Sequence, residues 1–244
     1  MAKRALALLL LAGACDFSPG GAGGVAGPDA GTDESPADDP DDPGDSGDAP
    51  ADPVYHAEIL PLSEEIRADM TGSSWHPDMG CPSLDDLALI SLNHRGLDGA
   101  VHDGELVVAA TAAASVAQAF GALFDAGFPI ERIERVDAYG GDDDASMAAN
   151  NTSAFNCRRV TGGTGLSQHS YGTAIDLNPV QNPYVRGDTV LPEAGEAYVE
   201  RTQVRPGMVT RPSAALDAFA AIGWTWGGDW DDPIDYQHFS ASGL

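Results

Sequence analysis

Basic residues are scarce in this chain. It contains 12 Lys and Arg residues against 38 Asp and Glu residues, so its formal net charge is −26, and Lys3 is its only lysine. A protein this acidic repels nucleic acids and anionic lipid headgroups. The composition therefore argues against a protein that binds nucleic acid, or a membrane surface, by charge.

Long apolar runs and internal repeats are also missing beyond the N-terminus. The one apolar run there covers residues 5–12, follows Lys3 and Arg4, and is too short to span a membrane as a mature helix. This pattern is typical of a secretory signal, and we expect a signal peptide at residues 1–14.

Cysteine is rare, and its three copies have different contexts. Small residues precede Cys15 in a pattern that resembles a bacterial lipobox, so we expect Cys15 to be lipid-modified and the chain to be anchored to the cell envelope facing the periplasm. Plain secretion is the alternative. Setting Cys15 aside leaves the even pair Cys81 and Cys157, which is either a disulfide or two buried thiols.

Large apolar side chains are nearly absent from residues 15–53. Ten acidic residues lie between Asp29 and Asp52, with no Lys or Arg among them. Such a segment cannot bury enough surface to offset its chain entropy, and its charges repel one another. We expect a disordered acidic linker that acts as a stalk, a role compatible with that of a solubilising tail.

Residues 54–244 are long enough to form one domain with a substantial core. Apolar residues four apart (Val116, Phe120, Phe124) predict a helix over 112–126, and Ser213 is a suitable N-cap for a helix over 214–222. Strands are expected at 105–108, 130–139, 155–160 and 173–177, with a short helix or strand entry at 84–92. This order predicts an α+β fold in which helices cover one face of an antiparallel sheet.

Two short stretches carry the chemistry. His169 and Asp176 stand seven residues apart around Gly172, and far downstream Asp235 and His238 stand three apart. Two histidines, one carboxylate and a second acid are the parts of a catalytic zinc site, which has three protein ligands, an open position for water, and a base. We therefore predict one zinc ion held by His169, Asp176 and His238.

Longer motifs give this prediction more specificity. Ser-x-His-x-x-Gly-x-Ala-x-Asp at 167–176, Trp-Gly-Gly-Asp-Trp at 226–230 and Asp-x-x-His-Phe at 235–239 resemble the zinc D-alanyl-D-alanine carboxypeptidase family. That family includes VanY-like carboxypeptidases, D-Ala-D-Ala dipeptidases and phage L-alanyl-D-glutamate endolysins, and it shares its fold with hedgehog domains. The resemblance spans roughly residues 60–242.

The resemblance also implies roles for individual residues. Asp235 corresponds to a general base three residues before the last ligand, and Arg158 in Phe-Asn-Cys-Arg would stabilise the oxyanion or clamp a substrate carboxylate. A surface salt bridge is the plainer interpretation of Arg158. We expect Ser167 and Tyr171 to orient the substrate or His169.

Three further groups of residues are not expected to take a direct part in catalysis. The run Asp142-Asp143-Asp144 is expected to be a solvated turn, because it lacks calcium-loop spacing. At least two of Trp224, Trp226 and Trp230 should pack in the core, and His102 is either ordinary or supports the site indirectly.

Together these features predict an exported zinc metallopeptidase of the cell wall. The leading reaction is D-alanyl-D-alanine carboxypeptidase activity on peptidoglycan stem peptides, by a monomer that meets the membrane only through a lipid anchor. One alternative is an L-alanyl-D-glutamate-type endopeptidase. Another is a non-catalytic, zinc-containing wall-binding module, although such a module has no need of a base at Asp235.

Overall fold

The computed structural model describes residues 52–243. The predicted signal peptide, Cys15 and nearly all of the predicted linker lie outside these residues. The helices are α1 (Glu64–Met70), α2 (Ala113–Asp125), α3 (Asp143–Ala148) and α4 (Ala214–Ala221). Short 3-10 helices cover Leu84–Asp86, Val136–Tyr139, Gln168–Tyr171, Glu193–Tyr198 and Gly227–Asp229. No helix within 52–243 has both the length and the apolar character needed to cross a bilayer.

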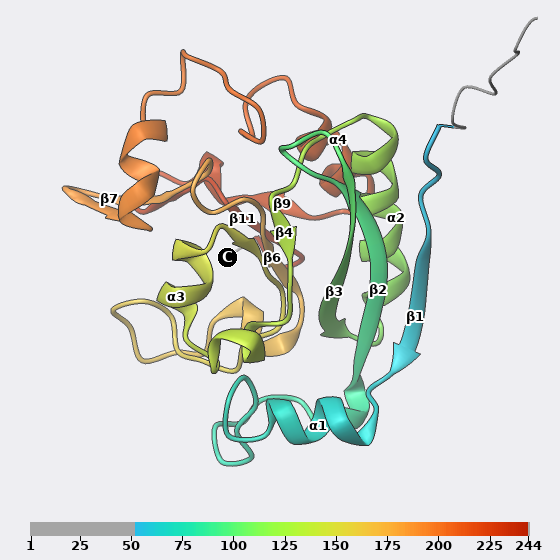
Figure 1. The fold of residues 1–244 in the computed structure, drawn as a ribbon. Helices are drawn as coiled ribbons and strands as arrows, with labels where there is room; N and C mark the ends of the chain where they lie inside the picture. The colour runs from blue at the N-terminus through green and yellow to red at the C-terminus, as the bar shows by residue number, and fades with distance from the viewer. Residues whose placement is uncertain (1–51, 244) are drawn as a thin grey trace, which may run out of the picture. The chain divides into compact units, whose positions relative to one another are not determined.

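The strands form three small antiparallel sheets and one parallel pair (Figure 1). They are β1 (Ala57–Pro61), β2 (Leu87–Arg95), β3 (Val101–Ala109), β4 (Arg132–Ile133), β5 (Asn151–Thr152), β6 (Ala174–Asp176), β7 (Tyr184–Arg186), β8 (Thr189–Leu191), β9 (Thr225–Trp226), β10 (Ile234–Asp235) and β11 (His238–Ser240). Antiparallel sheets with few helices agree with the predicted α+β class. The prediction of a single antiparallel sheet was wrong: the strands after β3 are only two or three residues long, and they pair in separate small sheets.

In the first sheet, β1-β2-β3, the central strand β2 is buried on both faces. Side chains alternate along a strand, so Ile90 and Leu92 of β2 enter one hydrophobic cluster while Leu87 and Leu89 enter another. The first cluster contains residues of α2 and α4, and the second contains Met70 of α1. This sheet therefore holds two parts of the core together.

Helix α2 confirms the prediction from apolar spacing. Val116, Phe120 and Leu123 are buried on one face, and the ring of Phe120 meets Phe219 of α4 edge-on, with 6.2 Å between ring centroids. Burial of each large apolar side chain contributes about 1.5–3 kcal/mol. Ser213 caps α4 as predicted, by accepting a hydrogen bond from the backbone N–H of Ala215.

The strands of two further sheets come from the last part of the chain, residues 174–240, and they carry Asp176, Asp235 and His238. One has the order β6-β11-β9 and the other β10-β7-β8. Only Tyr236 and Gln237 separate β10 from β11. That tight connection brings the two sheets together at the end of the chain.

The strand predicted over 130–139 is wrong except at β4. Ile130, Ile133 and Val136 are buried at every third residue, which is the period of a 3-10 turn and not of a strand. After Ile133 the side chain of Asn151 binds both the N–H and the carbonyl of Glu134, which replaces further strand pairing. A 3-10 helix then runs to Tyr139.

The strand predicted over 155–160 is also wrong. The N–H groups of Phe155, Asn156 and Cys157 donate to the carbonyls of Val107, His169 and Ser74 respectively. These acceptors belong to three separate segments, so no neighbouring strand can form a ladder with this one. The segment is a buried crossing, and a disulfide between Cys157 and Cys81 ties it to the loop after α1, with 6.0 Å between their Cα atoms.

Candidate functional site

His169 is placed by a short, tightly closed turn. The hydroxyl of Ser167 caps the 3-10 helix Gln168–Tyr171 by accepting from the N–H of His169 at 3.3 Å. Gly172 ends the helix with φ 67°, and a Cβ there would lie 2.3 Å from the backbone nitrogen of Ala109. Only glycine satisfies both conditions, so this turn sets His169 directly ahead of β6.

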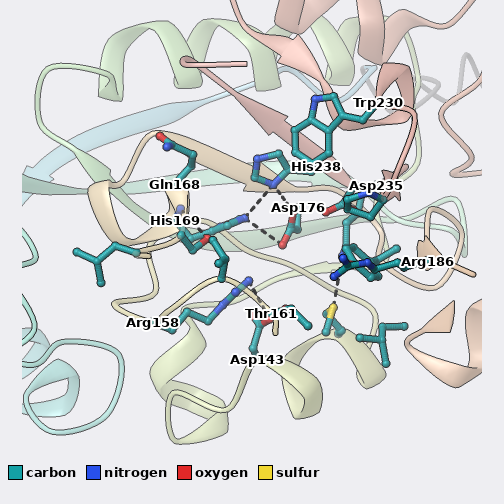
Figure 2. A pocket seen from close by; sticks show the side chains of 18 residues that line it. Asp143, Arg158, Thr161, Gln168, His169, Asp176, Arg186, Trp230, Asp235 and His238 are labelled. Carbon is teal, nitrogen blue, oxygen red and sulfur yellow. Dashed lines mark hydrogen bonds and ion pairs between the residues drawn. The ribbon is translucent and has the colours of Figure 1, made fainter. Parts of the chain in front are cut away.

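Asp176 and His238 face each other across a sheet. They are directly opposed in the antiparallel register of β6 and β11, which puts both side chains on the same face. The Nδ1 atom of His238 lies 3.1 Å from Oδ1 of Asp176, and Nε2 of His169 lies 3.1 Å from Oδ2 of Asp176. The two histidine nitrogens are 3.2 Å apart (Figure 2). The three predicted ligands thus converge on one point.

The donor set fits a metal ion. The Nδ1 of His169 lies 2.6 Å from the carbonyl oxygen of Ala154, and because a carbonyl only accepts, Nδ1 carries the proton. When the ring is neutral, as a metal ligand must be, its Nε2 lone pair is therefore directed at Asp176 and His238. A hydrogen bond at the other ring nitrogen, such as the one to Ala154, is usual for a metal-binding histidine. Among residues 52–243, this trio is the one group of three acids, cysteines or histidines close enough to hold an ion.

The electrostatics of the trio favour positive charge between its members. Burial by itself raises the pKa of the Asp176 carboxyl, but the charge of His169 and hydrogen bonds from both histidines outweigh it and hold that pKa below its ordinary range. Burial lowers the pKa of His169, and the neighbouring Asp176 carboxylate more than reverses this. A site that draws a proton to this point also suits a divalent cation.

Asp235 lies beside the trio without joining it. It is buried on β10, and its Oδ1 has no hydrogen-bond partner within the described part of the chain. Burial, together with the negative charge of Asp176, raises the pKa of Asp235 from 3.8 to about 7. The carboxyl is therefore close to half-protonated near neutral pH.

Arg158 forms an ion pair that the sequence did not reveal. Its Nη2 lies 2.8 Å from Oδ2 of Asp143, and the two side chains are 22% and 18% exposed. Burial raises the pKa of Asp143, and the Arg158 guanidinium opposes that shift. The prediction that the whole aspartate run is a solvated turn was therefore wrong at Asp143: Asp142, which caps α3, and Asp144 are exposed, but Asp143 lines the cavity.

The metal trio, Asp235, Arg158 and Asp143 line one cavity of ≈ 410 Å³, which Figure 2 shows from close by. Five charged residues besides the histidines face it: Asp143, Arg158, Asp176, Arg186 and Asp235. Its apolar and aromatic lining consists of Met147, Val160, Leu166, Tyr184, Leu191, Trp230 and Pro233. A largely apolar cleft with a few converging charges is typical of a small-molecule or peptide site.

The other predicted residues are divided between the cavity and the rest of the domain. Ser167 lines the cavity, whereas Tyr171 is 41% exposed and does not. Trp224 and Trp226 pack in the core, as predicted for at least two tryptophans, and Trp230 lines the cavity. His102 does not reach it and bonds to Asp98.

Sequence reasoning missed Asp143 and Arg186 as cavity residues. Asp143 stands in a run of three like charges, of which one faces inward. Arg186 is on β7, whose pairing partner β10 comes some fifty residues later in the chain. No local pattern distinguishes either residue from a surface charge.

Comparison with known proteins agrees with this site. A family model described as D-alanyl-D-alanine carboxypeptidase matches residues 161–241. No curated protein and no solved structure gives a match. The matched segment contains His169, Asp176, Asp235 and His238. The resemblance to the VanY-like D-alanyl-D-alanine carboxypeptidase family is therefore confirmed over residues 161–241 of this chain.

Proposed function

We propose that the domain is a zinc metallopeptidase that removes the C-terminal D-alanine from peptidoglycan stem peptides, built on the hedgehog/D,D-peptidase type of zinc fold. The matched family supports a metallopeptidase. The observation that carries the proposal is the convergence of His169, Asp176 and His238 in one cavity, next to the buried carboxyl of Asp235, whose Oδ1 has no hydrogen-bond partner among residues 52–243. A wall-binding module would need the trio at most, and not Asp235.

The metal would be held by Nε2 of His169, a carboxylate oxygen of Asp176 and Nδ1 of His238. When bound by such a set, zinc supplies a Lewis acid for the peptide carbonyl and lowers the pKa of a water at its open position. The hydrogen bond from His169 to Ala154 keeps the ring in the required tautomer. The burial of all three side chains limits competition by bulk water.

Asp235 is the group that moves protons. Its carboxyl faces the same cavity, and no residue in the described part of the chain hydrogen-bonds to its Oδ1, so it can take a proton from the attacking water and pass it to the leaving amine. Burial raises the pKa of this carboxyl, which favours its holding the proton between removal from the water and transfer to the amine. His169 cannot serve, since one ring nitrogen binds Ala154 and the other points to the metal position.

Arg158 supplies guanidinium N–H donors in a fixed position. The ion pair with Asp143 holds its guanidinium at the cavity wall, and the hydroxyl of Ser170 accepts from its backbone N–H at 2.9 Å. A guanidinium held in place by Asp143 can donate hydrogen bonds to the oxyanion that develops on the substrate carbonyl without having to reorganise.

Export and anchoring are part of the proposal. We infer that residues 1–14 are a signal peptide, that Cys15 carries lipid, and that residues 15–53 are a stalk for the domain at 54–244. The disulfide between Cys81 and Cys157 supports an oxidising compartment such as the periplasm. Release of a Cys15→Ser variant into the soluble fraction after export would test the anchor.

The test is digestion of purified muropeptides, with products identified by mass spectrometry. The expected product is a stem peptide shorter by its C-terminal D-alanine. Cleavage after L-alanine would indicate the endopeptidase instead. Asp235→Ala should keep one zinc per chain while activity falls about 10²–10⁴-fold. A zinc-loaded wild type that cleaves no wall peptide would leave only the binding module.

A further inference from the structure

Two guanidinium groups line the cavity, and they differ in how their charge is balanced. Arg158 is neutralised by Asp143 at 2.8 Å, with both side chains mostly buried. Arg186 approaches Asp232 only at 3.9 Å, and these two side chains are 57% and 68% exposed. Exposed pairs at such a distance contribute little free energy, so Arg186 remains available to another anion. Figure 2 shows Arg158 beside Asp143, and Arg186 apart from that pair.

The strand register places Arg186 at a defined distance from the chemistry. Tyr184 of β7 is directly opposite Asp235 of β10. Side chains alternate along a strand, so Tyr184 and Arg186 share the cavity face while Val185 points away, and the first two line the cavity. Two residues along a strand correspond to about 7 Å. A long arginine side chain spans much of that distance.

The distance from Asp235 to Arg186 along the strands is comparable to the length of the peptide residue that follows the cleaved bond. An extended chain advances about 3.3–3.6 Å per residue. A carboxylate one residue beyond the cleaved bond therefore lies within reach of a side chain rooted two strand positions from Asp235. Since the whole chain carries a net charge of −26, an anionic peptide end also needs a local cation to be bound here.

We propose that Arg186 binds the C-terminal carboxylate of the substrate and so restricts cleavage to the last residue of a peptide; this rests on the proposed peptidase function. The planar guanidinium pairs with a carboxylate through two parallel hydrogen bonds. Asp232 keeps the side chain near the mouth of the cavity and yields to the substrate. Arg158, already paired with Asp143, is left to the reacting carbonyl.

The experiment uses the zinc-loaded full chain and one stem peptide ending in D-Ala-D-Ala, supplied as the free acid and as the C-terminal amide. Wild type should show a KM about 10- to 100-fold lower for the acid, the size of one charge-assisted contact. Arg186→Gln should raise the KM for the acid to that for the amide with kcat nearly unchanged, because the contact is made equally before and during reaction. Arg186→Lys should retain part of the preference.

Arg211→Gln is the matched control. Arg211 is 62% exposed and paired with Asp229, yet it does not line the cavity, so its loss should leave both KM values alone. A further peptide pair, with diaminopimelate or lysine at the third position, tests whether the carboxylate is instead on a side chain.

Each outcome decides the assignment. An Arg186→Gln variant that keeps the full preference for the acid would overturn it. So would a variant that loses only the discrimination between diaminopimelate and lysine, which would place a side-chain carboxylate at Arg186. Equal cleavage of acid and amide by wild type would refute Arg186 and leave the peptidase standing. Wild type that cleaves neither would refute the proposed function and this inference with it.

Discussion

Asp235 gives the sharpest test of the site, because its ionisation should be visible in the stability of the metal-free protein. The perturbation is Asp235→Asn, which keeps the shape of the side chain and removes its charge. The folded-state pKa of about 7 lies above the ordinary value of 3.8, so between these values the folded chain holds a proton that the unfolded chain has released. The free energy of unfolding of wild type should therefore fall as pH rises through that window.

The magnitude follows from the size of the shift. Each pKa unit corresponds to about 1.36 kcal/mol, so a shift of about three units makes the charged carboxylate cost roughly 4 kcal/mol once the pH exceeds about 8. Near pH 5.5 the cost is about half of that. Asp235→Asn should match wild type below about pH 4 and become increasingly more stable above it.

Urea denaturation of chelator-treated wild type and variant across this range measures the difference directly. Zinc provides the second arm, because its positive charge favours the ionised carboxylate and lowers the pKa of Asp235. In zinc-saturated protein the advantage of Asp235→Asn should shrink. A difference between wild type and variant that stays constant from about pH 4 to 8 in the metal-free protein would refute a buried carboxyl with a raised pKa.

Three other predictions concern the groups around Asp235. Asp143→Ala leaves the charge of Arg158 unpaired and should cost up to about 3 kcal/mol of unfolding free energy, whereas Asp144→Ala, its exposed neighbour, should change it by less than about 0.5 kcal/mol; equal effects would contradict an inward ion pair. Removing the Cys81–Cys157 disulfide by a double serine substitution should cost about 4 kcal/mol, because the loop it closes is long, with a sequence separation of 76; alkylation of both thiols in unreduced, denatured wild type would disprove the bond. Asp176→Asn should lose the one zinc found per chain by metal analysis while His102→Ala keeps it, and full zinc content in Asp176→Asn would mean that the metal binds elsewhere.

The residues of the metal trio could be named from the sequence because each lies in a short motif that fixes the local backbone geometry. Ser167 caps the turn, Gly172 closes it, and Asp176 follows within a short strand, so the order of residue types already encodes the local geometry. Helices α2 and α4 were predictable for the same kind of reason, since apolar spacing and an N-cap act within a few residues of chain. Local signals of this kind do not depend on the rest of the fold.

The segments over 130–139 and 155–160 show where local signals end. Their apolar and β-branched residues are compatible with strands, yet their backbone groups found partners on Asn151, Val107, His169 and Ser74 instead. Strand pairing needs a neighbour with a matching ladder, and the identity of that neighbour is decided by the packing of the whole domain.

The same division applies to the site. The sequence by itself determined which residues could hold a metal and which acid could act as a base. Tertiary structure alone decided that Asp143 pairs with Arg158, and that Arg186 faces the cavity from the strand paired with that of Asp235. It also decided that burial beside Asp176 raises the pKa of Asp235 to about 7. Ion pairs and desolvation depend on distance and solvent exposure in three dimensions, and neither quantity is present in the order of residues along the chain.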